Sequence, residues 1–181
     1  MPTNTVDGVR WLKRSAEDGW PKSEFSLATY YFNGTYPFQK DIAEALKWLS
    51  LAAAHDHAEA QYILAYRLFN GIDAPKNSDG AIRLWRRAAE LGYAKAQGDL
   101  GYAIETGYAE TSDLAEACMW HKLAADQGIA RAKVNLAKLI PRLSSKQYQE
   151  AMRRVDLFRP QSTPRLDPVM PSPEGLLTPS N

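Results

Sequence analysis

Apolar and small side chains recur at helical spacing along most of the chain, and the pattern is clearest in residues 113–128. Within this stretch Ala117, Trp120 and Ala124 fall three and four residues apart, so they lie on one face of a helix. Asp113 stands before them, where an aspartate side chain accepts a hydrogen bond from a free N–H of the first turn. The pattern therefore predicts an amphipathic helix that begins directly after Asp113.

The signals at the two ends of this stretch return elsewhere in the chain. Glu116 can complete a box-like cap with the preceding aspartate, and Gly128 can adopt the left-handed conformation that ends a helix. The same layout occurs in residues 4–19, 41–56 and 77–92. Three columns define it: Asn4, Asp41, Asn77 and Asp113 at the N-cap; Trp11, Trp48, Leu84 and Trp120 in the middle; and Gly19, Asp56, Gly92 and Gly128 at the end. Their spacings of 37, 36 and 36 residues identify a repeat protein.

A second helical stretch follows the end of each copy, so each repeat holds two helices. We call the stretches described above the B helices and the stretches that follow them the A helices, because a full repeat begins with an A helix and ends with a B helix. The A helices carry a column of small residues: Ala28, Ala65, Gly101 and Ala137. The predicted A helices are 21–33, 58–70, 94–106 and 130–140, and the predicted B helices are 5–18, 42–55, 78–91 and 114–127. Alanine and glycine let helix axes approach closely. One helix pair cannot bury its apolar stripe alone, so the pairs must stack on one another.

The two ends of the chain differ from the middle. Pro141 stops the last A helix, and Ser144 can cap a further helix that covers the end of the stack. These patterns predict an all-α fold: a right-handed α-solenoid of about four antiparallel helix pairs, with 36-residue repeats and a C-terminal capping helix. The solenoid is predicted to span residues 4–157. Residues 158–181 are rich in proline and are predicted to form a disordered tail.

The small, apolar and glycine columns match a known pattern in two successive repeats. The first supplies Ala60, Leu64, Ala65, Leu68, Gly71, Asn77, Ala81, Leu84, Ala88, Ala89 and Gly92, and the next supplies Ala96, Leu100, Gly101, Ile104, Gly107, Asp113, Ala117, Trp120, Ala124, Ala125 and Gly128. This pattern resembles the Sel-1-like repeat family, a relative of the tetratricopeptide repeat. One departure is Asp56, which replaces the terminating glycine, although aspartate tolerates the left-handed conformation better than most residues.

Charge and cysteine content narrow the class of protein further. The net charge is only +1, so no overall field attracts nucleic acid or membranes. Residues 1–130 carry 13 basic and 17 acidic side chains, a net charge of −4, whereas residues 131–181 carry 9 and 4, a net charge of +5. The basic end is either a solvated face or a docking patch for an acidic partner. Cys118 is the only cysteine, which excludes an intramolecular disulfide, and its column predicts a core position.

The sequence shows no targeting or membrane segment. Its first residues lack the charged start and apolar run of a signal peptide, and no stretch approaches the roughly 20 apolar residues that span a bilayer. We therefore expect a cytoplasmic protein, and a periplasmic one only if a signal peptide has been removed.

No constellation of residues predicts catalysis. The only cluster of metal-ligand residue types is His55, Asp56 and His57, which falls in the turn between a B and an A helix. Adjacent residues in a turn rarely converge on one metal, so we interpret the cluster as a polar turn with Asp56 ending the helix. His121 shares a column with Leu12, Leu49 and Trp85 and is predicted to pack on a helix face. The sequence thus predicts no enzyme activity, no cofactor and no metal.

The resemblance to tetratricopeptide proteins implies that the A helices line a concave groove. This geometry predicts twelve partner-binding residues: Phe25, Thr29, Asn33, Tyr62, Tyr66, Phe69, Asn70, Lys95, Tyr102, Glu105, Arg131 and Lys138. The set is rich in aromatic residues, which carry much of the energy of protein interfaces. Asn33 and Asn70 share a column and are predicted to hold the backbone of an extended peptide.

The predicted function is therefore a non-enzymatic adaptor that binds a protein or peptide in this groove. An alternative is a bacterial immunity or effector-type protein that neutralises a toxin or enzyme by direct binding. A hydrolase that uses the histidine cluster, and a nucleic-acid binder that uses the basic C-terminal third, are disfavoured because neither a catalytic set nor a regular aromatic and basic stripe is present. The sequence does not predict the oligomeric state.

Overall fold

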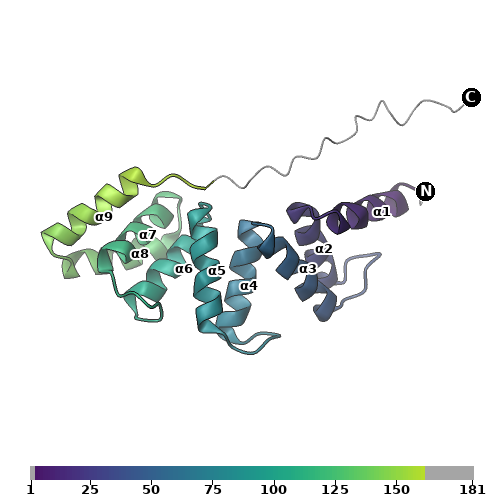
Figure 1. The fold of residues 1–181 in the computed structure, drawn as a ribbon, viewed down its shortest axis with the longest axis horizontal. Helices are drawn as coiled ribbons and strands as arrows, with labels where there is room; N and C mark the ends of the chain where they lie inside the picture. The colour runs from purple at the N-terminus through teal and green to yellow at the C-terminus, as the bar shows by residue number, and fades with distance from the viewer. Residues whose placement is uncertain (1–2, 162–181) are drawn as a thin grey trace, which may run out of the picture.

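The computed structural model describes residues 3–161, with side chains from residue 7 onward, and contains helices and no strands in that range. The elements are α1 (Thr3–Glu17), α2 (Pro21–Asn33), α3 (Ile42–Ala54), α4 (Ala58–Asn70), α5 (Ser78–Glu90), α6 (Ala94–Glu105), α7 (Leu114–Asp126), α8 (Ala130–Leu139), a 3-10 turn (Ile140–Arg142) and α9 (Ser145–Leu157). The all-α fold and the alternation of A and B helices are confirmed. Figure 1 shows the resulting elongated stack.

The N-cap column forms as predicted in three repeats and differs in the first. The side chains of Asp41, Asn77 and Asp113 each accept a backbone hydrogen bond from the first turn of the following helix. Helix α1, however, begins at Thr3, so Asn4 lies inside the helix and does not precede it. The box-like cap predicted for Glu116 is also absent, because its carboxylate accepts from Arg86 and from Trp120 Nε1 instead.

The chain leaves most helices through a residue in the left-handed conformation. Asp56 has φ 61° where the other repeats have Gly19 at 86°, Gly92 at 88° and Gly128 at 93°. The Asp56 carboxylate compensates for the loss of glycine, since it accepts hydrogen bonds from Gln61 Nε2 and from the Arg87 guanidinium of the next repeat. The substitution in this column therefore adds a contact between repeats.

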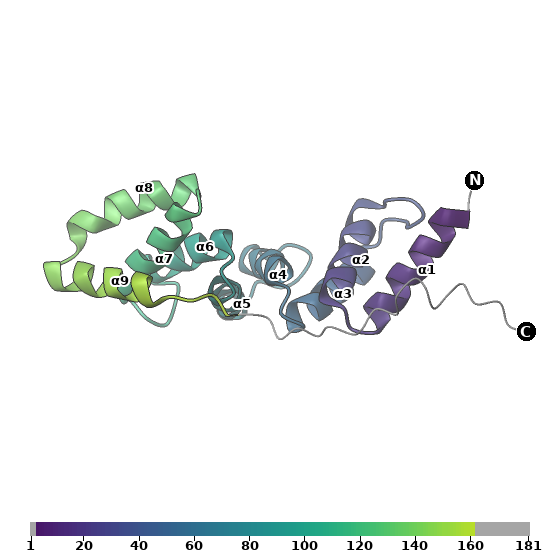
Figure 2. The same ribbon diagram turned by 90° about the horizontal axis from the view of Figure 1, so that it is seen from above.

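The A helices α2, α4 and α6 each pack most closely on the B helix that follows, whereas α8 packs most closely on the preceding helix, α7. The B column Ala45, Ala81 and Ala117 is 0% exposed, and the A column Ala28 and Ala65 is 0–1% exposed. Larger side chains fill the space on either side, as Trp85 and Leu100 do in the largest apolar cluster. Seen from above, the A helices form the inner side of a shallow arch and the B helices its outer side (Figure 2).

The terminal helix α9 does not continue the regular stack. It packs on α7, where Ala151 is fully buried and Arg154 pairs with Asp113, the N-cap of α7. Ser144 and Gln147 form a complete capping box at its start.

The packed chain continues beyond the predicted boundary at residue 157. Phe158 meets the Trp120 ring edge to face at 5.5 Å, and the backbone N–H of Gln161 donates to the Glu90 carbonyl at 2.9 Å. Residues 158–161 thus lie along the B helices. The rest of the predicted tail, residues 162–181, lies outside the described part of the chain.

Two buried glycines on α6 test how tightly the helices approach. A Cβ on Gly98 would meet only methyl groups at 3.8 Å, whereas a Cβ on Gly101 would lie 3.0 Å from His121 Nδ1 and 3.2 Å from the Ala117 carbonyl. Alanine is favoured over glycine in a helix by about 1 kcal/mol, but overpacking costs about 1–3 kcal/mol. We expect Gly98→Ala to raise the free energy of unfolding measured by urea titration. The free energy of unfolding of Gly101→Ala should be about 1–3 kcal/mol lower than that of Gly98→Ala. Equal stability of the two variants would show that α6 and α7 are not in close contact at Gly101.

Candidate protein-binding surface

The twelve predicted residues lie on the A helices or in their last turns, and the structure divides them by exposure. Exposed side chains belong to Asn33, Tyr66, Asn70, Lys95, Tyr102, Arg131 and Lys138. Partly buried side chains belong to Phe25, Thr29, Tyr62, Phe69 and Glu105. We call the face formed by α2, α4, α6 and α8 the A-helix face. Its accessible aromatic groups are therefore tyrosines rather than phenylalanines.

The two phenylalanines of the set act mainly within the solenoid. Phe25 stacks on the His57 imidazole with ring centroids 4.5 Å apart. Phe69 packs on Trp85 at 5.0 Å and meets Tyr108 edge to face at 5.4 Å. The Thr29 hydroxyl donates to the Phe25 carbonyl one turn earlier. These three side chains thus shape the A-helix face and offer a partner little free surface.

The centre of the A-helix face is a polar cluster around Asp99, a residue that the sequence did not single out. Arg131 from α8 lies 3.7 Å from the Asp99 carboxylate and stacks over the Tyr102 ring at 5.0 Å. Tyr62 from α4 approaches the same carboxylate and packs on Tyr93 at 5.3 Å. Three A helices therefore meet at one carboxylate.

Burial controls the protonation of this cluster. It raises the pKa of the Tyr62 phenol to about 12, with a smaller contribution from the Asp99 charge, because the phenolate would lose its hydration. Burial also raises the pKa of Asp99, while Arg131 and Tyr62 oppose that change. The sequence signal for Asp99 was weak: its column holds Ser26, Ile63 and Asn135, so it is the only charged member.

Glu105 joins the A-helix face to the core. Its carboxylate forms an ion pair with the Arg142 guanidinium on the solvent side and lies 3.3 Å from His121 Nε2 on the core side. His121 is fully buried, in agreement with its apolar column. Burial lowers the pKa of His121, and the nearby Glu105 charge only partly offsets this, so the imidazole is neutral at pH 7.

The side chains of His55, Asp56 and His57, in the turn after α3, each contact a different partner and do not converge. His55 Nδ1 lies 2.9 Å from the Glu24 carboxylate, Asp56 pairs with Arg87, and His57 Nδ1 accepts from the N–H of Ala60 at the start of α4. Within residues 3–161, no three His, Cys, Asp or Glu side chains are placed to share a metal ion. Cys118 is buried, which raises the pKa of its thiol and disfavours the nucleophilic thiolate.

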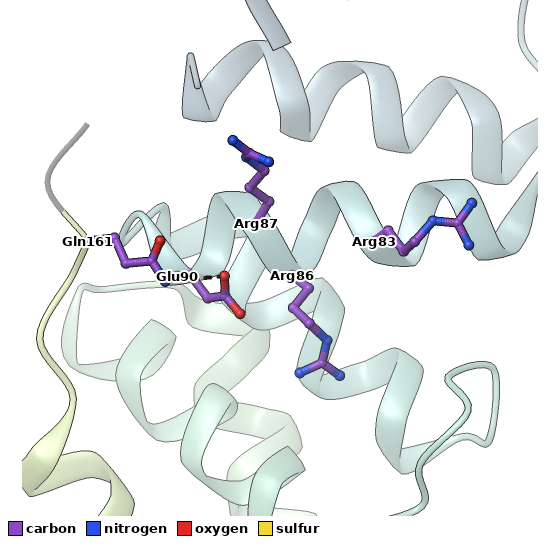
Figure 3. Close-up of a pocket in the computed structure, with 5 residues that line it drawn as sticks. All are labelled: Arg83, Arg86, Arg87, Glu90 and Gln161. Carbon is purple, nitrogen blue, oxygen red and sulfur yellow. Dashed lines mark hydrogen bonds between the residues drawn. The ribbon is translucent and has the colours of Figure 1, made fainter. Parts of the chain in front are cut away.

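The opposite face carries a cluster of arginines on α5. Arg83, Arg86 and Arg87 line a shallow pocket with Glu90 and Gln161, the end of the docked segment. Figure 3 shows that the three guanidinium groups point away from one another. Arg86 pairs with Glu116 and Arg87 with Asp56, so the pocket stabilises contacts between repeats and does not present converging cations to an anion.

The structure defines the class of protein as an α-solenoid of helix pairs repeated about every 36 residues. The model of the Sel1 repeat family matches residues 1–20, 21–57, 58–93 and 94–129. The chain therefore belongs to the Sel1 repeat family, as its columns predicted. Sel1 repeats are in general non-catalytic scaffolds for protein–protein interaction.

Curated relatives share the repeats over a small part of their length. The chain is 32% identical over 137 residues to chitin synthase regulatory factor 3 of Schizosaccharomyces pombe, and 32% identical over 130 residues to the chitin synthase regulator SKT5 of Malassezia restricta. The matches cover 75% and 71% of this chain but 14% and 9% of those two proteins.

Solved structures confirm the fold. A Sel1 repeat protein from Oxalobacter formigenes is 30% identical and superposes with a TM-score of 0.68, over 72% of this chain and 98% of that one. A protective antigen of uropathogenic Escherichia coli with an SLR fold is 22% identical, with a TM-score of 0.61 over 84% of this chain and 40% of that one. In the described part of our chain, no helix is both long and apolar enough to cross a membrane.

The buried imidazole of His121 predicts a pH dependence of stability. The unfolded chain binds a proton at this histidine below about pH 6.5, whereas the lowered pKa keeps the folded form neutral. The free energy of unfolding should therefore fall as the pH drops below about 6.5. Urea titrations at pH 7.5 and 5.5 measure this change, and the free energy of unfolding of His121→Gln should fall less between these two pH values than that of the wild type. A wild-type protein that becomes more stable at pH 5.5 would mean that Glu105 holds a proton on His121.

Proposed function

We propose that the protein is an adaptor that binds an extended segment of a partner protein along the A-helix face. The observation that carries the proposal is the pair of exposed tyrosines, Tyr66 at 49% and Tyr102 at 38%, at the same column of successive A helices. Tyrosine gives an interface a large, rigid contact area together with a hydroxyl group that hydrogen-bonds. Arg131 stacks over Tyr102, so that ring is already positioned before a partner arrives.

The charges on this face favour a partner segment with acidic and apolar side chains. Lys95, Arg131 and Lys138 are exposed on the A helices α6 and α8, and α8 contains three basic residues and no acidic one. Asn70 Nδ2 donates to the Tyr66 carbonyl, which leaves the oxygen of the same amide to accept a peptide N–H. Acidic side chains near α8 and an apolar side chain between Tyr66 and Tyr102 would satisfy all of these groups.

The relatives support a regulatory role for such an adaptor. Two proteins that share the repeats bear the names of chitin synthase regulators. A regulator that acts by contact needs a binding surface, and the A-helix face would supply it. No observation favours the alternative of an immunity or effector-type protein, and a cytoplasmic location stays a prediction.

The A-helix face can be tested by removing its two exposed rings. We expect Tyr66→Ala combined with Tyr102→Ala to weaken binding of a captured partner at least tenfold, because truncation of a central tyrosine at an interface costs about 2 kcal/mol or more. Partners captured from cell extract with the wild-type chain would be identified by mass spectrometry and their affinities measured by calorimetry. The thermal midpoint should change little, since both side chains are exposed.

Tyr148→Ala supplies the matched control. Tyr148 is 40% exposed on α9, away from the A-helix face. This variant should bind every partner as the wild type does. Loss of binding in Tyr148→Ala with retention in the double variant would place the binding surface on the C-terminal helix and refute the proposal.

A further inference from the structure

The interface between an A helix and its own B helix is repeated three times inside the chain. It joins α2 to α3, α4 to α5 and α6 to α7. In the last of these the Cβ position of Gly101 lies 3.2 Å from the Ala117 carbonyl, so the two small-residue columns face each other directly. Their members in these three pairs are all buried. This interface is therefore a fixed structural unit of the solenoid.

Helix α8 carries the A half of this unit, and within residues 3–161 no helix packs on it as the following B helix does on α2, α4 and α6. Helix α9, which follows it, packs on α7. Ala137 of the small column is exposed, although Ala65 and Gly101 are buried. Lys133 is exposed where Gln61 and Gln97 are fully buried, and Ile140 is 39% exposed where Ile104 is 0% exposed. These exposed positions mark the surface of α8 that a B helix covers on the A helices of the other repeats.

Helix α1 presents the converse face, a B half that no A helix of residues 3–161 precedes. Gly8 shares the column of Ala45, Ala81 and Ala117, yet it is exposed, and apart from its own stretch of α1 nothing lies within 4 Å of the position of its Cβ. Trp11 is 58% exposed, whereas Trp48 of the same column, which has an A helix before it, is partly buried against that helix and the core.

We propose that α1 of a second copy of this chain docks on α8 and completes an A–B pair between the two copies. The unit it completes is the interface already present three times in the fold, and among residues 3–161 α8 carries an uncovered A half and α1 an uncovered B half. The close contact matches in size as well, because Ala137 against Gly8 has the same total bulk as Gly101 against Ala117. Docking would cover two apolar side chains that are otherwise in water, Trp11 and Ile140.

The geometry of this contact determines the type of assembly. The two surfaces differ, so the interface is head-to-tail, and it propagates into a chain or a closed ring and does not stop at a symmetric dimer. Each added copy would also extend the A-helix face. The assembly can be tested apart from the proposed peptide binding, because Gly8, Trp11 and Ala137 are not among the twelve residues of the binding set.

The assembly is tested by sedimentation velocity of the full chain over a wide range of concentrations. The average mass of the wild type should rise above that of a monomer as the concentration increases. Ala137→Arg and Trp11→Glu should each remain monomeric over the same range, with unchanged circular dichroism melting curves. Ala54→Arg alters an exposed alanine on α3, away from both ends, and should assemble as the wild type does.

Mixing the two end variants gives the decisive result. Ala137→Arg keeps an intact α1 and Trp11→Glu keeps an intact α8, so an equimolar mixture should form a dimer and nothing larger. Restored dimers show a head-to-tail contact and show that both variants are folded. A wild type that stays monomeric at the highest concentration, variants that still assemble, or a mixture that stays monomeric would each overturn the proposal.

Discussion

The close approach of each A helix to its own B helix is the contact on which the rest of the structure depends. Alanine or glycine occupies both sides of this contact in every complete repeat, so the helix axes can approach until backbone and Cβ atoms touch. The large side chains then fill the space between successive pairs, and burial is shared along the stack. One bulky residue in either column would separate the helices and change the direction of the repeats that follow.

This contact also decides which side chains a partner can reach. Because the B helices cover one flank of every A helix, the A helices are left in a row along the inner side of the arch (Figure 2). Residues one repeat apart then become neighbours, as Tyr62, Asp99 and Arg131 do, and each holds the next in place. The outer side has a different chemistry: Arg86 and Arg87 pair with Glu116 and Asp56 of neighbouring repeats, and the docked segment bonds to Glu90 through Gln161. The two faces are therefore suited to different tasks, binding on one and cohesion on the other.

The repeat made much of the fold predictable from the sequence, since α1 to α8 could be placed by comparison with their copies; α9 has no copy and was placed from Pro141 and Ser144. The left-handed Asp56 and the buried Cys118 followed from their columns alone. What the columns could not predict were contacts between different columns of neighbouring repeats. Asp99 with Arg131 and Glu116 with Arg86 depend on the rotation from one repeat to the next, which a column alignment does not contain. Phe158 on Trp120 was missed because the prolines that follow it predicted a disordered tail from residue 158 onward. The predicted binding set therefore included Phe25 and Phe69, which mainly pack within the solenoid, and omitted Asp99.

The central claim is that partners bind on the A-helix face, and amide hydrogen exchange with and without a captured partner tests it most directly. The account predicts that binding slows exchange in α4, α6 and α8 and leaves the solvent-facing side of α5 and the whole of α9 unchanged. Slower exchange confined to α5, α9 and the segment at residues 158–161 would contradict it, because the binding surface would then lie on the outer side of the arch.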